Sequence, residues 1–385
     1  MVTTSSVPFH GIEREFQDLR EPMLAAVESA LASGRALQSP LVERLESELA
    51  RRADRRHAVA VNSCTDALYF ALLAVGVGRG DEVLVPDLSF AATASSVLRT
   101  GATAIFVDVD GELGLDLHLA EQALTEATKA IVYVHLFGRL SKPVVVEAFA
   151  RRHGLVLVED AAQSFGAEDG SRPAGSLGHV SCYSFDPTKV VSAPAGGGAV
   201  LTDDDECAAT VRALRYHGRV GGEYERLGFN SQLSTLAAAA LLVKLAQEER
   251  WLRRRRAIAR TYCEALGGCG VQLPAAGHER QHVFHKFVVR TSERDTLAAE
   301  LGAHGVPTLV HYPYRLSALP FVQGLPHRTV GGGKAAAATG ELLSLPIHPY
   351  LRADEVERVG RAGASFRARL ERERGPACRT EAGSR

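Results

Sequence analysis

The stretch Leu155-Val156-Leu157-Val158-Glu159-Asp160 is an apolar run that ends in two acidic residues, and Ser181-Cys182-Tyr183-Ser184-Phe185-Asp186-Pro187-Thr188-Lys189 follows it along the chain. Continuous apolar runs of this length predict strands buried on both faces, as in a parallel sheet covered by helices. Because ligands bind at the carboxyl ends of such strands, we expect Asp160 and Lys189 to lie at one rim of the sheet. An amine and a carboxylate at one rim suit a pyridoxal phosphate site, in which the lysine forms an imine and the aspartate keeps the pyridine nitrogen protonated.

Each of these two residues also has a simpler interpretation. An aspartate after a strand often caps the following helix, and a single lysine is usually solvated. The chain has six lysines, which are Lys129, Lys142, Lys189, Lys244, Lys286 and Lys334. Only Lys189 directly follows a strand-like run and a Ser-Phe-Asp-Pro-Thr turn. Lys189 is therefore the candidate for the lysine that binds the cofactor.

Three motifs follow one another in this part of the chain: Val158-Glu159-Asp160-Ala161-Ala162-Gln163, Tyr183-Ser184-Phe185-Asp186-Pro187-Thr188-Lys189 and Gly196-Gly197-Gly198-Ala199-Val200. In this order they resemble the sugar aminotransferases of the DegT/StrS group. Members of that group are fold-type I pyridoxal phosphate enzymes that aminate keto sugars or keto cyclitols. The resemblance extends from about Phe16 to about Val359 and implies a transaminase with pyridoxal 5'-phosphate as its cofactor.

Apolar runs alternate with helical patterns along much of the chain. They predict an α/β fold with a mainly parallel seven-stranded sheet between helices, and the resemblance implies the fold-type I aminotransferase architecture. The expected strands are His57–Asn62, Glu82–Pro86, Ala104–Val109, Ala130–His135, Leu155–Glu159, Val180–Ser184 and Gly198–Thr202. We expect residues 1–250 to form an N-terminal arm and a large cofactor-binding domain. Residues 251–385 should form a smaller C-terminal α/β domain with a disordered tail after Arg374.

Further elements follow from the spacing of apolar residues. Two helices are expected in the arm, at Glu21–Ala32 and Pro40–Arg52, with Gly34 ending the first of them. One long helix should run from about Ser234 to Leu266. In the small domain we expect strands at Phe284–Arg290 and Thr308–Tyr312, a helix at Thr296–His304 and a helix from Asp354 onward.

The segment Ser63-Cys64-Thr65-Asp66 opens a helix directly after the first strand, where free backbone amides can bind a phosphate. An ordinary helix cap explains the same residues, but the resemblance assigns Cys64 and Thr65 to the cofactor phosphate. The resemblance also implies that Phe90 stacks on the pyridine ring, that Gln163 lies beside the ring oxygen and that Ser184 binds the phosphate.

The resemblance further implies a homodimer with shared active sites. Asn230 matches a residue that reaches the cofactor phosphate of the partner subunit, and His311 and Tyr312 match a stretch near the substrate. Three positions depart from the common pattern: Gln232 replaces an arginine, Thr235 an acidic residue and Ser317 a histidine. The contacts of those three side chains therefore cannot be carried over.

Composition limits the possible partners. The formal net charge of -1, with 23% charged residues, gives no basic field that would attract nucleic acid. No apolar run is long enough to span a bilayer, and the N-terminus lacks the apolar core of a signal peptide. The six cysteines have no zinc-ribbon or redox spacing, as is typical of free thiols in a reducing cytosol. We expect a cytoplasmic protein whose partners are small molecules and a second copy of itself, with no nucleic acid and no membrane.

Three local patterns are weaker signals. Gly76-Val77-Gly78-Arg79-Gly80 precedes a strand and so predicts a turn, because a dinucleotide fingerprint follows its strand. His278, His282 and His285 would align on a helix as metal ligands, but Val283–Val289 has the pattern of a strand, and we expect no metal site. Arg253–Arg256 has the pattern of a solvated helix face, with contact to a diphosphate or a partner acid as the alternative.

These observations and the resemblance together predict an aminotransferase. The resemblance implies transfer of an amino group from glutamate or glutamine to a nucleotide-linked keto sugar, in amino-sugar or antibiotic biosynthesis. Lys189 would act as general base and then general acid. A keto cyclitol is an alternative acceptor that the residues do not separate from a sugar. Lys189 argues against related dehydratases, in which this lysine is replaced. A cofactor-binding regulator without turnover is an alternative of another class, which we would expect to carry a DNA-binding module.

Overall fold

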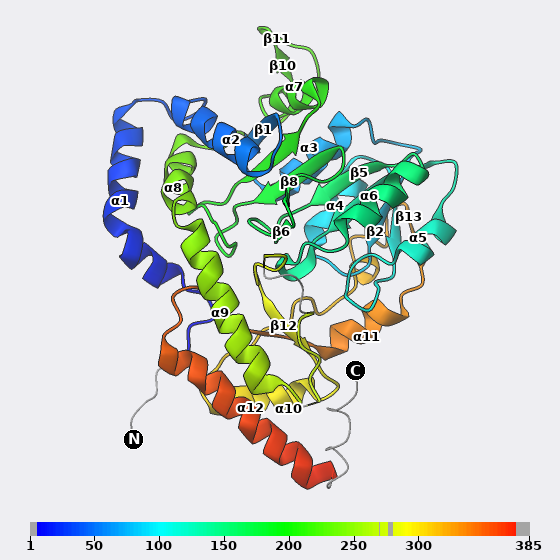
Figure 1. Ribbon diagram of the computed structural model, residues 1–385. Coiled ribbons are helices and arrows are strands. Elements are labelled where there is room, and N and C mark those ends of the chain that lie inside the picture. The colour runs from blue at the N-terminus through cyan, green and yellow to red at the C-terminus, as the bar shows by residue number, and fades with distance from the viewer. Residues whose placement is uncertain (1–5, 269, 276–279, 375–385) are drawn as a thin grey trace.

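The computed structural model describes residues 6–268, 270–275 and 280–374. Its main element is an eight-stranded sheet in the order β1-β9-β8-β5-β4-β2-β3-β13 (Figure 1). The strands are β1 (His57–Val61), β2 (Glu82–Pro86), β3 (Thr103–Val107), β4 (Thr128–Val134), β5 (Val156–Asp160), β8 (Val180–Ser184), β9 (Gly198–Thr202) and β13 (His327–Val330). Only the two pairings of β9, with β1 and with β8, are antiparallel. The predicted α/β fold with a mainly parallel sheet is confirmed.

The eighth strand, β13, was not among the seven strands that the sequence predicts. It pairs in parallel with β3 at the edge of the sheet. Its sequence, His327-Arg328-Thr329-Val330, has a single aliphatic residue, and all four side chains are exposed or half-buried. An edge strand of this kind lacks the continuous apolar run that marks strands covered on both faces.

Helices cover both faces of the sheet. Alternate residues of each strand point to opposite faces, and apolar side chains on both faces pack against helices. Val83 and Val85 of β2 belong to a core that includes α3, α4 and α7, whereas Leu84 belongs to a second core with α5 and α6. These helices are α3 (Cys64–Ala74), α4 (Ala91–Arg99), α5 (Leu117–Ala123), α6 (Pro143–Arg152) and α7 (Asp205–Leu214). With both faces covered, the carboxyl rim of the strands is the natural place for a ligand.

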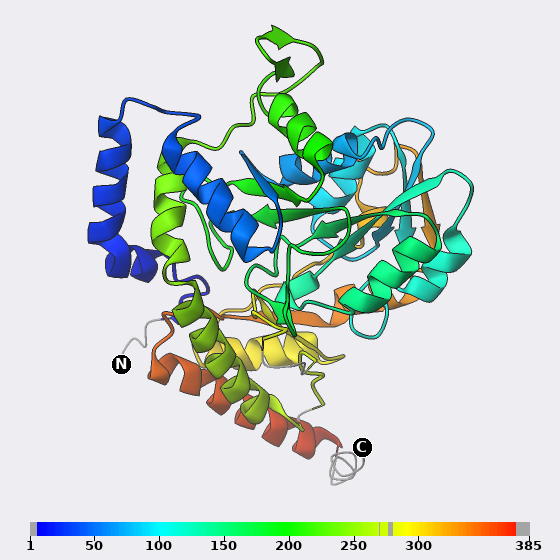
Figure 2. The same cartoon turned by 45° about the horizontal axis from the view of Figure 1, so that its top comes forward.

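The N-terminal arm consists of α1 (Ile12–Ala32) and α2 (Pro40–Arg52), and α1 lies beside α8 (Thr235–Leu245) in both views (Figures 1 and 2). Gly34 follows α1 with a φ of 66°, as its predicted place at the helix end requires. The prediction of one helix from Ser234 to Leu266 is wrong. The chain turns at residues 246–247 and continues as α9 (Glu248–Leu266). The start of α9 packs in the same core as α8, and its second half packs in another core.

That other core is smaller and is built from α9, α10 (Arg294–Ala303), α12 (Ala353–Arg374), β12 (Phe287–Arg290) and β14 (Leu342–Leu345). Figure 2 shows these helices on the side of the molecule away from the sheet. The predicted strand at Thr308–Tyr312 is wrong, since Leu309 makes only an isolated bridge to Ser344. The predicted strand at Phe284–Arg290 begins later, at Phe287, because Phe284 has a φ of 48°.

We propose a domain division near residue 250, with this small core on the C-terminal side. Two C-terminal elements return to the large sheet: β13 joins its edge, and α11 (Gly333–Glu341) packs Ala335 and Ala338 into its core. The remaining short elements are η1 (Leu136–Gly138), β6 (Glu168–Asp169), β7 (Arg172–Pro173), β10 (Arg219–Val220), β11 (Glu223–Tyr224) and η2 (Leu316–Ala318). Within the described ranges, no helix combines the length and apolar character needed to cross a bilayer. The predicted tail after Arg374 lies outside the described residues.

Candidate active site

The carboxyl ends of β5 and β8 bring Asp160 and the turn that carries Lys189 to one rim of the sheet. The strands are parallel, and Asp160 at the end of β5 pairs with Cys182 of β8. After β8 the chain makes a turn in which the Asp186 carboxylate accepts hydrogen bonds from the backbone N–H (3.0 Å) and hydroxyl (2.7 Å) of Thr188. This turn places Lys189 directly beyond the end of the strand.

A cavity of about 700 Å³ opens at this rim. Nine of the ten residues predicted from the sequence line it: Cys64, Thr65, Phe90, Asp160, Gln163, Ser184, Lys189, His311 and Tyr312. Asn230, the tenth, does not line it. Asn230 is exposed on the protein surface, where its backbone bridges to Tyr216.

Asp160 is buried at the bottom of this cavity, with 4% of its surface exposed. Its carboxylate accepts hydrogen bonds from the Thr93 hydroxyl (3.2 Å) and the Ala162 N–H (3.1 Å). Burial raises the pKa of the Asp160 carboxyl, an effect that these hydrogen bonds and the Lys189 charge oppose. Within the described part of the chain Asp160 forms no ion pair. Its carboxylate can therefore bind a cationic ring nitrogen.

Lys189 is half-buried at the cavity wall. Burial lowers the pKa of its amine, and the Cys64 thiol, Asp160 and Asp186 oppose that effect. No hydrogen-bond partner for Nζ of Lys189 is found among residues 6–268, 270–275 and 280–374. A lysine amine of lowered pKa and without a partner is suited to attack a carbonyl or to carry a proton.

The N-terminus of α3 supplies the backbone amides on another side of the cavity. Ser63 caps the helix by accepting a hydrogen bond from the Asp66 N–H (3.1 Å), and the amides of the first turn have no acceptor within the helix. A Cβ atom on Gly198 would lie 2.6 Å from the Cys64 nitrogen, so glycine allows the helix to start this close to the sheet. Burial raises the pKa of the Cys64 thiol well above its usual range. Cys64 therefore offers a phosphate its backbone amide, not a thiolate.

Aromatic and amide groups form the opposite wall. The Gln163 side chain accepts a hydrogen bond from the Phe137 N–H (2.9 Å) and donates one to the Tyr312 hydroxyl (3.4 Å), which fixes its orientation. Phe90 keeps 55% of its surface exposed, and its ring centre lies 6.0 Å from that of Tyr312. An exposed ring at a cavity wall is available to stack on a flat ligand.

Several lining residues were not predicted from the sequence. They are His10, Asn62, Ser63, Ser89, Thr93, Asp186, Thr188, His285 and Lys286, with glycines of the Gly196–Gly197 turn. Ser89 and Thr93 follow the carboxyl end of β2, a position that could have marked them. His10 has no local signal, because the arm that carries it is far from the other residues in sequence.

The three departures from the family pattern have structural contacts. Ser317 is buried, and its backbone N–H and hydroxyl donate hydrogen bonds to the Asp87 carboxylate at 2.7 and 2.9 Å. Gln232 accepts a hydrogen bond from the Gln38 side chain (2.6 Å), and the Thr235 hydroxyl bonds to that of Ser39 (2.9 Å). Gln232 and Thr235 thus hold the loop between α1 and α2 in place.

Two weaker predictions also have an outcome. The solvated face predicted for Arg253–Arg256 is wrong for Arg255 and Arg256, each 5% exposed, because both turn toward the small core. Of the three histidines, His278 lies outside the described residues, and His282 stacks on Phe284 with ring centres 3.9 Å apart. No group of three potential metal ligands occurs in the part of the chain that the structure describes.

Residues 17–362 match the model of the DegT/DnrJ/EryC1/StrS aminotransferase family. The chain belongs to this family. It is 39% identical to a dTDP-3-amino-3,4,6-trideoxy-alpha-D-glucose transaminase of Streptomyces venezuelae, over 92% of this chain and 95% of that one. It is 37% identical to a protein of Geobacillus stearothermophilus named pleiotropic regulatory protein, over 94% and 98% of the two chains. The crystal structure of S. venezuelae DesV in complex with a ketimine intermediate has a TM-score of 0.90 at 38% identity and covers 94% of this chain and 99% of its own.

The chain is thus an aminotransferase of the DegT/DnrJ/EryC1/StrS family, and pyridoxal phosphate is its cofactor, as similar proteins solved in their pyridoxal and pyridoxamine phosphate forms indicate. The cavity fits this cofactor on its own chemistry. Asp160 offers a buried carboxylate, Lys189 an unpartnered amine and the start of α3 a set of amides for a phosphate. The predicted family and cofactor are confirmed.

Proposed function

We propose that this aminotransferase transfers an amino group from glutamate or glutamine to a nucleotide-linked keto sugar. One observation carries the proposal: a buried carboxylate, Asp160, and an amine without a hydrogen-bond partner in the described residues, Lys189, line the same large cavity. The similarity to a dTDP-amino-sugar transaminase over nearly the whole of both chains supports a sugar as the acceptor. The cavity volume of about 700 Å³ is within the range of sites that bind ligands of this size.

In this proposal the described residues divide the work of holding the cofactor. Asp160 binds the pyridine nitrogen, and the ring of Phe90 covers one face of the ring. Ser184, Thr65 and the Cys64 amide bind the phosphate, which the start of α3 attracts. When bound, pyridoxal phosphate supplies an electron sink for the carbon that loses its proton.

Lys189 moves the proton in this proposal. Its amine would accept the proton from the α carbon of the donor as general base and would return a proton as general acid. The lowered pKa of Lys189 supports the first role, because an amine must be neutral to act as a base. Gln163, fixed between Phe137 and Tyr312, would contact the cofactor hydroxyl and orient the ring.

A homodimer completes the site in the same proposal. Asn230 is exposed and does not line the cavity of its own chain. A residue that binds the phosphate in the partner's site is expected to be exposed in this way when one subunit is viewed alone. Exposed apolar side chains precede Asn230 in the chain, with Leu227 94% and Tyr224 68% exposed. Apolar groups that stay this exposed in one subunit are typical of an interface.

Two other functions stay open to test. A keto cyclitol would use the same residues and differ only in the acceptor. A regulator without turnover is suggested by the name of the G. stearothermophilus relative. A protein of that kind would bind pyridoxal phosphate but would transfer no nitrogen.

The test uses ¹⁵N-labelled glutamate and glutamine with a panel of dTDP- and UDP-linked keto sugars and keto cyclitols. Mass spectrometry of the product shows whether the label has moved. We expect label in a nucleotide-linked amino sugar, no transfer by Lys189→Ala, and normal transfer by the control Lys334→Ala, whose side chain is exposed. Label only in a cyclitol would contradict the sugar assignment, and no label in any acceptor would favour the regulator.

A further inference from the structure

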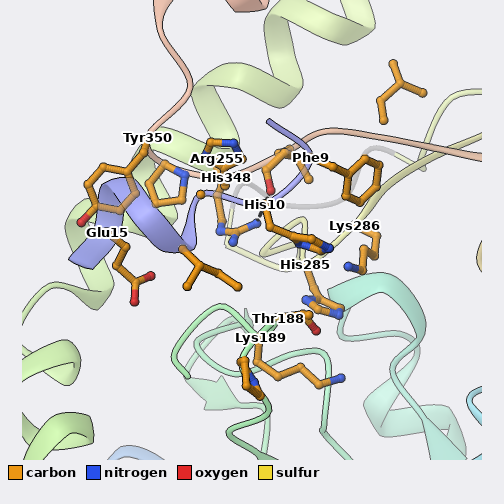
Figure 3. Close-up of a pocket in the computed structure, with 16 residues that line it drawn as sticks. Phe9, His10, Glu15, Thr188, Lys189, Arg255, His285, Lys286, His348 and Tyr350 are labelled. Carbon is orange, nitrogen blue, oxygen red and sulfur yellow. Dashed lines mark hydrogen bonds between the residues drawn. The ribbon is translucent and has the colours of Figure 1, made fainter. Parts of the chain in front are cut away.

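A second, small cavity of about 30 Å³ lies next to the cofactor cavity and shares part of its wall, including His10, Lys189, His285 and Lys286. The arm forms one side of it, and the turn before Lys189 forms its floor. Figure 3 shows Arg255, His285 and Lys286 reaching from the small core toward the space above Lys189, with His10 of the arm among them. The cavity is large enough for a few atoms only.

The cavity wall carries two buried cations. Arg255 is 5% exposed, and its Nη1 donates hydrogen bonds to the carbonyls of Phe284 (3.0 Å) and Ile347 (2.9 Å). Lys286 is 7% exposed, and burial together with the charges of Lys189 and Arg255 lowers its pKa to about 8. Within the described residues neither cation forms an ion pair with an acidic side chain.

The acidic groups near this wall already have partners. Glu15 lines the cavity, but its carboxylate lies 2.5 Å from Nζ of Lys244. Asp186 does not line this cavity; it accepts both hydrogen bonds of Thr188, and its charge partly offsets those of Lys189 and Lys286. The wall therefore has more positive than negative charge, and burying such charge is costly unless an anion offsets it.

Two buried nitrogen atoms at this wall, Nε of Arg255 and Nδ1 of His285, have no hydrogen-bond partner among the described residues. The two side chains are 5% and 4% exposed. Buried polar groups are nearly always paired, so unpaired ones indicate a missing ligand or water. An anion in the cavity would lie beside Arg255, His285 and Lys286 and would balance the charge.

We propose that this cavity is a carboxylate subsite, in which Lys286, Arg255 and His285 hold a carboxylate of the amino donor while the donor's amine lies near Lys189. The inference deepens the proposed function and rests on it. Both cavities border Lys189, so one small molecule can reach both. A carboxylate fits the volume of about 30 Å³, whereas a nucleotide diphosphate fits only the larger cavity.

The first experiment measures the donor half-reaction in single turnovers, from the change in cofactor absorbance, for wild type, Lys286→Met and Lys286→Arg. A hydrogen bond to a charged group contributes roughly 1.5–3 kcal/mol, so Lys286→Met should weaken the apparent affinity for glutamate by about tenfold to a hundredfold. Lys286→Arg keeps the positive charge and should therefore retain part of the affinity for glutamate. Lys334→Met, at the exposed lysine, is the matched control and should behave as wild type.

The second experiment needs no turnover. Calorimetry measures the binding of glutarate, a dicarboxylate without an amine, to the holoenzyme and to the same variants, each first checked for a wild-type circular dichroism spectrum. We expect glutarate to bind wild type and Lys286→Arg and to bind Lys286→Met much more weakly. Equal glutarate affinity in wild type and Lys286→Met, together with an unchanged donor affinity, would overturn the subsite.

Two further outcomes are separate from these. If Lys286→Met impairs the step with the keto sugar and leaves the donor step unchanged, the cations serve the acceptor's diphosphate, and the inference is wrong. If wild-type protein reacts with neither glutamate nor glutamine, the proposed donor fails before any variant is compared. Failure of the subsite and failure of the proposed function are thereby distinguished.

Discussion

The charges of Asp160 and Lys189 are set by their surroundings. Asp160 is buried, yet two hydrogen bonds stabilise its charged form, and a cationic partner would stabilise it further. Lys189 directly follows a turn, its amine has no hydrogen-bond partner in the described part of the chain, and its pKa is lowered. One group is thus prepared to stabilise positive charge and the other to exchange a proton.

Replacing Asp160 tests the first role. Asp160→Asn keeps the shape but removes the negative charge, and a charge-assisted hydrogen bond contributes roughly 1.5–3 kcal/mol. We expect the donor half-reaction to slow by about tenfold to a hundredfold in single-turnover absorbance measurements. Thr93→Val, which removes one hydrogen bond to the same carboxylate, should have a smaller effect. An Asp160→Asn protein with the wild-type rate would contradict the role of the carboxylate.

The lowered pKa of Lys286 predicts that the free energy of unfolding depends on pH. Its pKa in the folded protein is about 8, below the ordinary 10.5, because burial disfavours the charged amine. Below pH 8 the lysine is charged in both states, and folding carries the cost of burying that charge. As pH rises from about 8 to 10.5 the folded protein loses this proton first, so the cost is removed and stability increases.

Urea denaturation of wild type and Lys286→Met checks this dependence across that range. The free energy of unfolding of wild type should rise relative to that of the variant by up to about 3 kcal/mol. The Lys334→Met control should follow wild type at every pH. Parallel curves for wild type and Lys286→Met would show that the buried amine does not titrate as described.

At the scale of elements, the cofactor site depends on the close approach of α3 to the sheet. Gly198 of β9 faces the start of the helix, where a Cβ atom would lie 2.6 Å from backbone atoms of Ser63 and Cys64. Gly198→Ala should displace the helix start, destabilise the protein by about 1–3 kcal/mol and weaken cofactor binding. Equilibrium dialysis against pyridoxal phosphate measures the second effect. Gly111→Ala, with no atom within 4 Å of its added Cβ, is the control, and equal cofactor affinity in the two variants would contradict this reading.

The arm is fixed to the C-terminal helix by one buried ion pair. Arg14 of α1 donates two hydrogen bonds of 2.7 Å to the Glu355 carboxylate of α12, which is 1% exposed. Arg14→Met should destabilise the protein by about 1–3 kcal/mol, since it removes a partner of a buried carboxylate. Arg20→Met, on the exposed face of α1, should stay within about 0.5 kcal/mol of wild type. Chemical denaturation compares the two, and equal losses would argue against the ion pair.

How far the sequence predicts each element follows from its burial. Six of the seven predicted strands contain a run of at least three apolar residues, because helices cover both faces of the sheet, and the seventh, β8, is predicted from the motif that follows it. The edge strand β13 has no such run, and the break between α8 and α9 contains neither glycine nor proline, so both lack a local signal. The same holds at the site: motif residues such as Asp160 and Lys189 are predicted, whereas His10, Arg255 and Lys286 come together only through packing of the arm against the small core.

At the scale of the whole molecule, the proposal requires two chains, because Asn230 is exposed and does not line its own cavity. Mixing Lys189→Ala and Asn230→Ala subunits tests this. A mixed dimer has one site with both residues intact only if Asn230 serves the partner's site, so partial recovery of transfer is expected after subunit exchange. If Asn230 acts in its own chain, no site in the mixed dimer is intact and activity stays at the level of the separate variants.

The central claim is that Lys189 carries the cofactor at the rim next to Asp160. The most direct measurement is reduction of the holoenzyme with borohydride, followed by digestion and mass spectrometry to find the lysine that retains the cofactor. The account predicts the cofactor on the peptide that contains Lys189, and none retained in Lys189→Ala. Cofactor on a different lysine, with the neighbouring Lys286 as the first to examine, would contradict it.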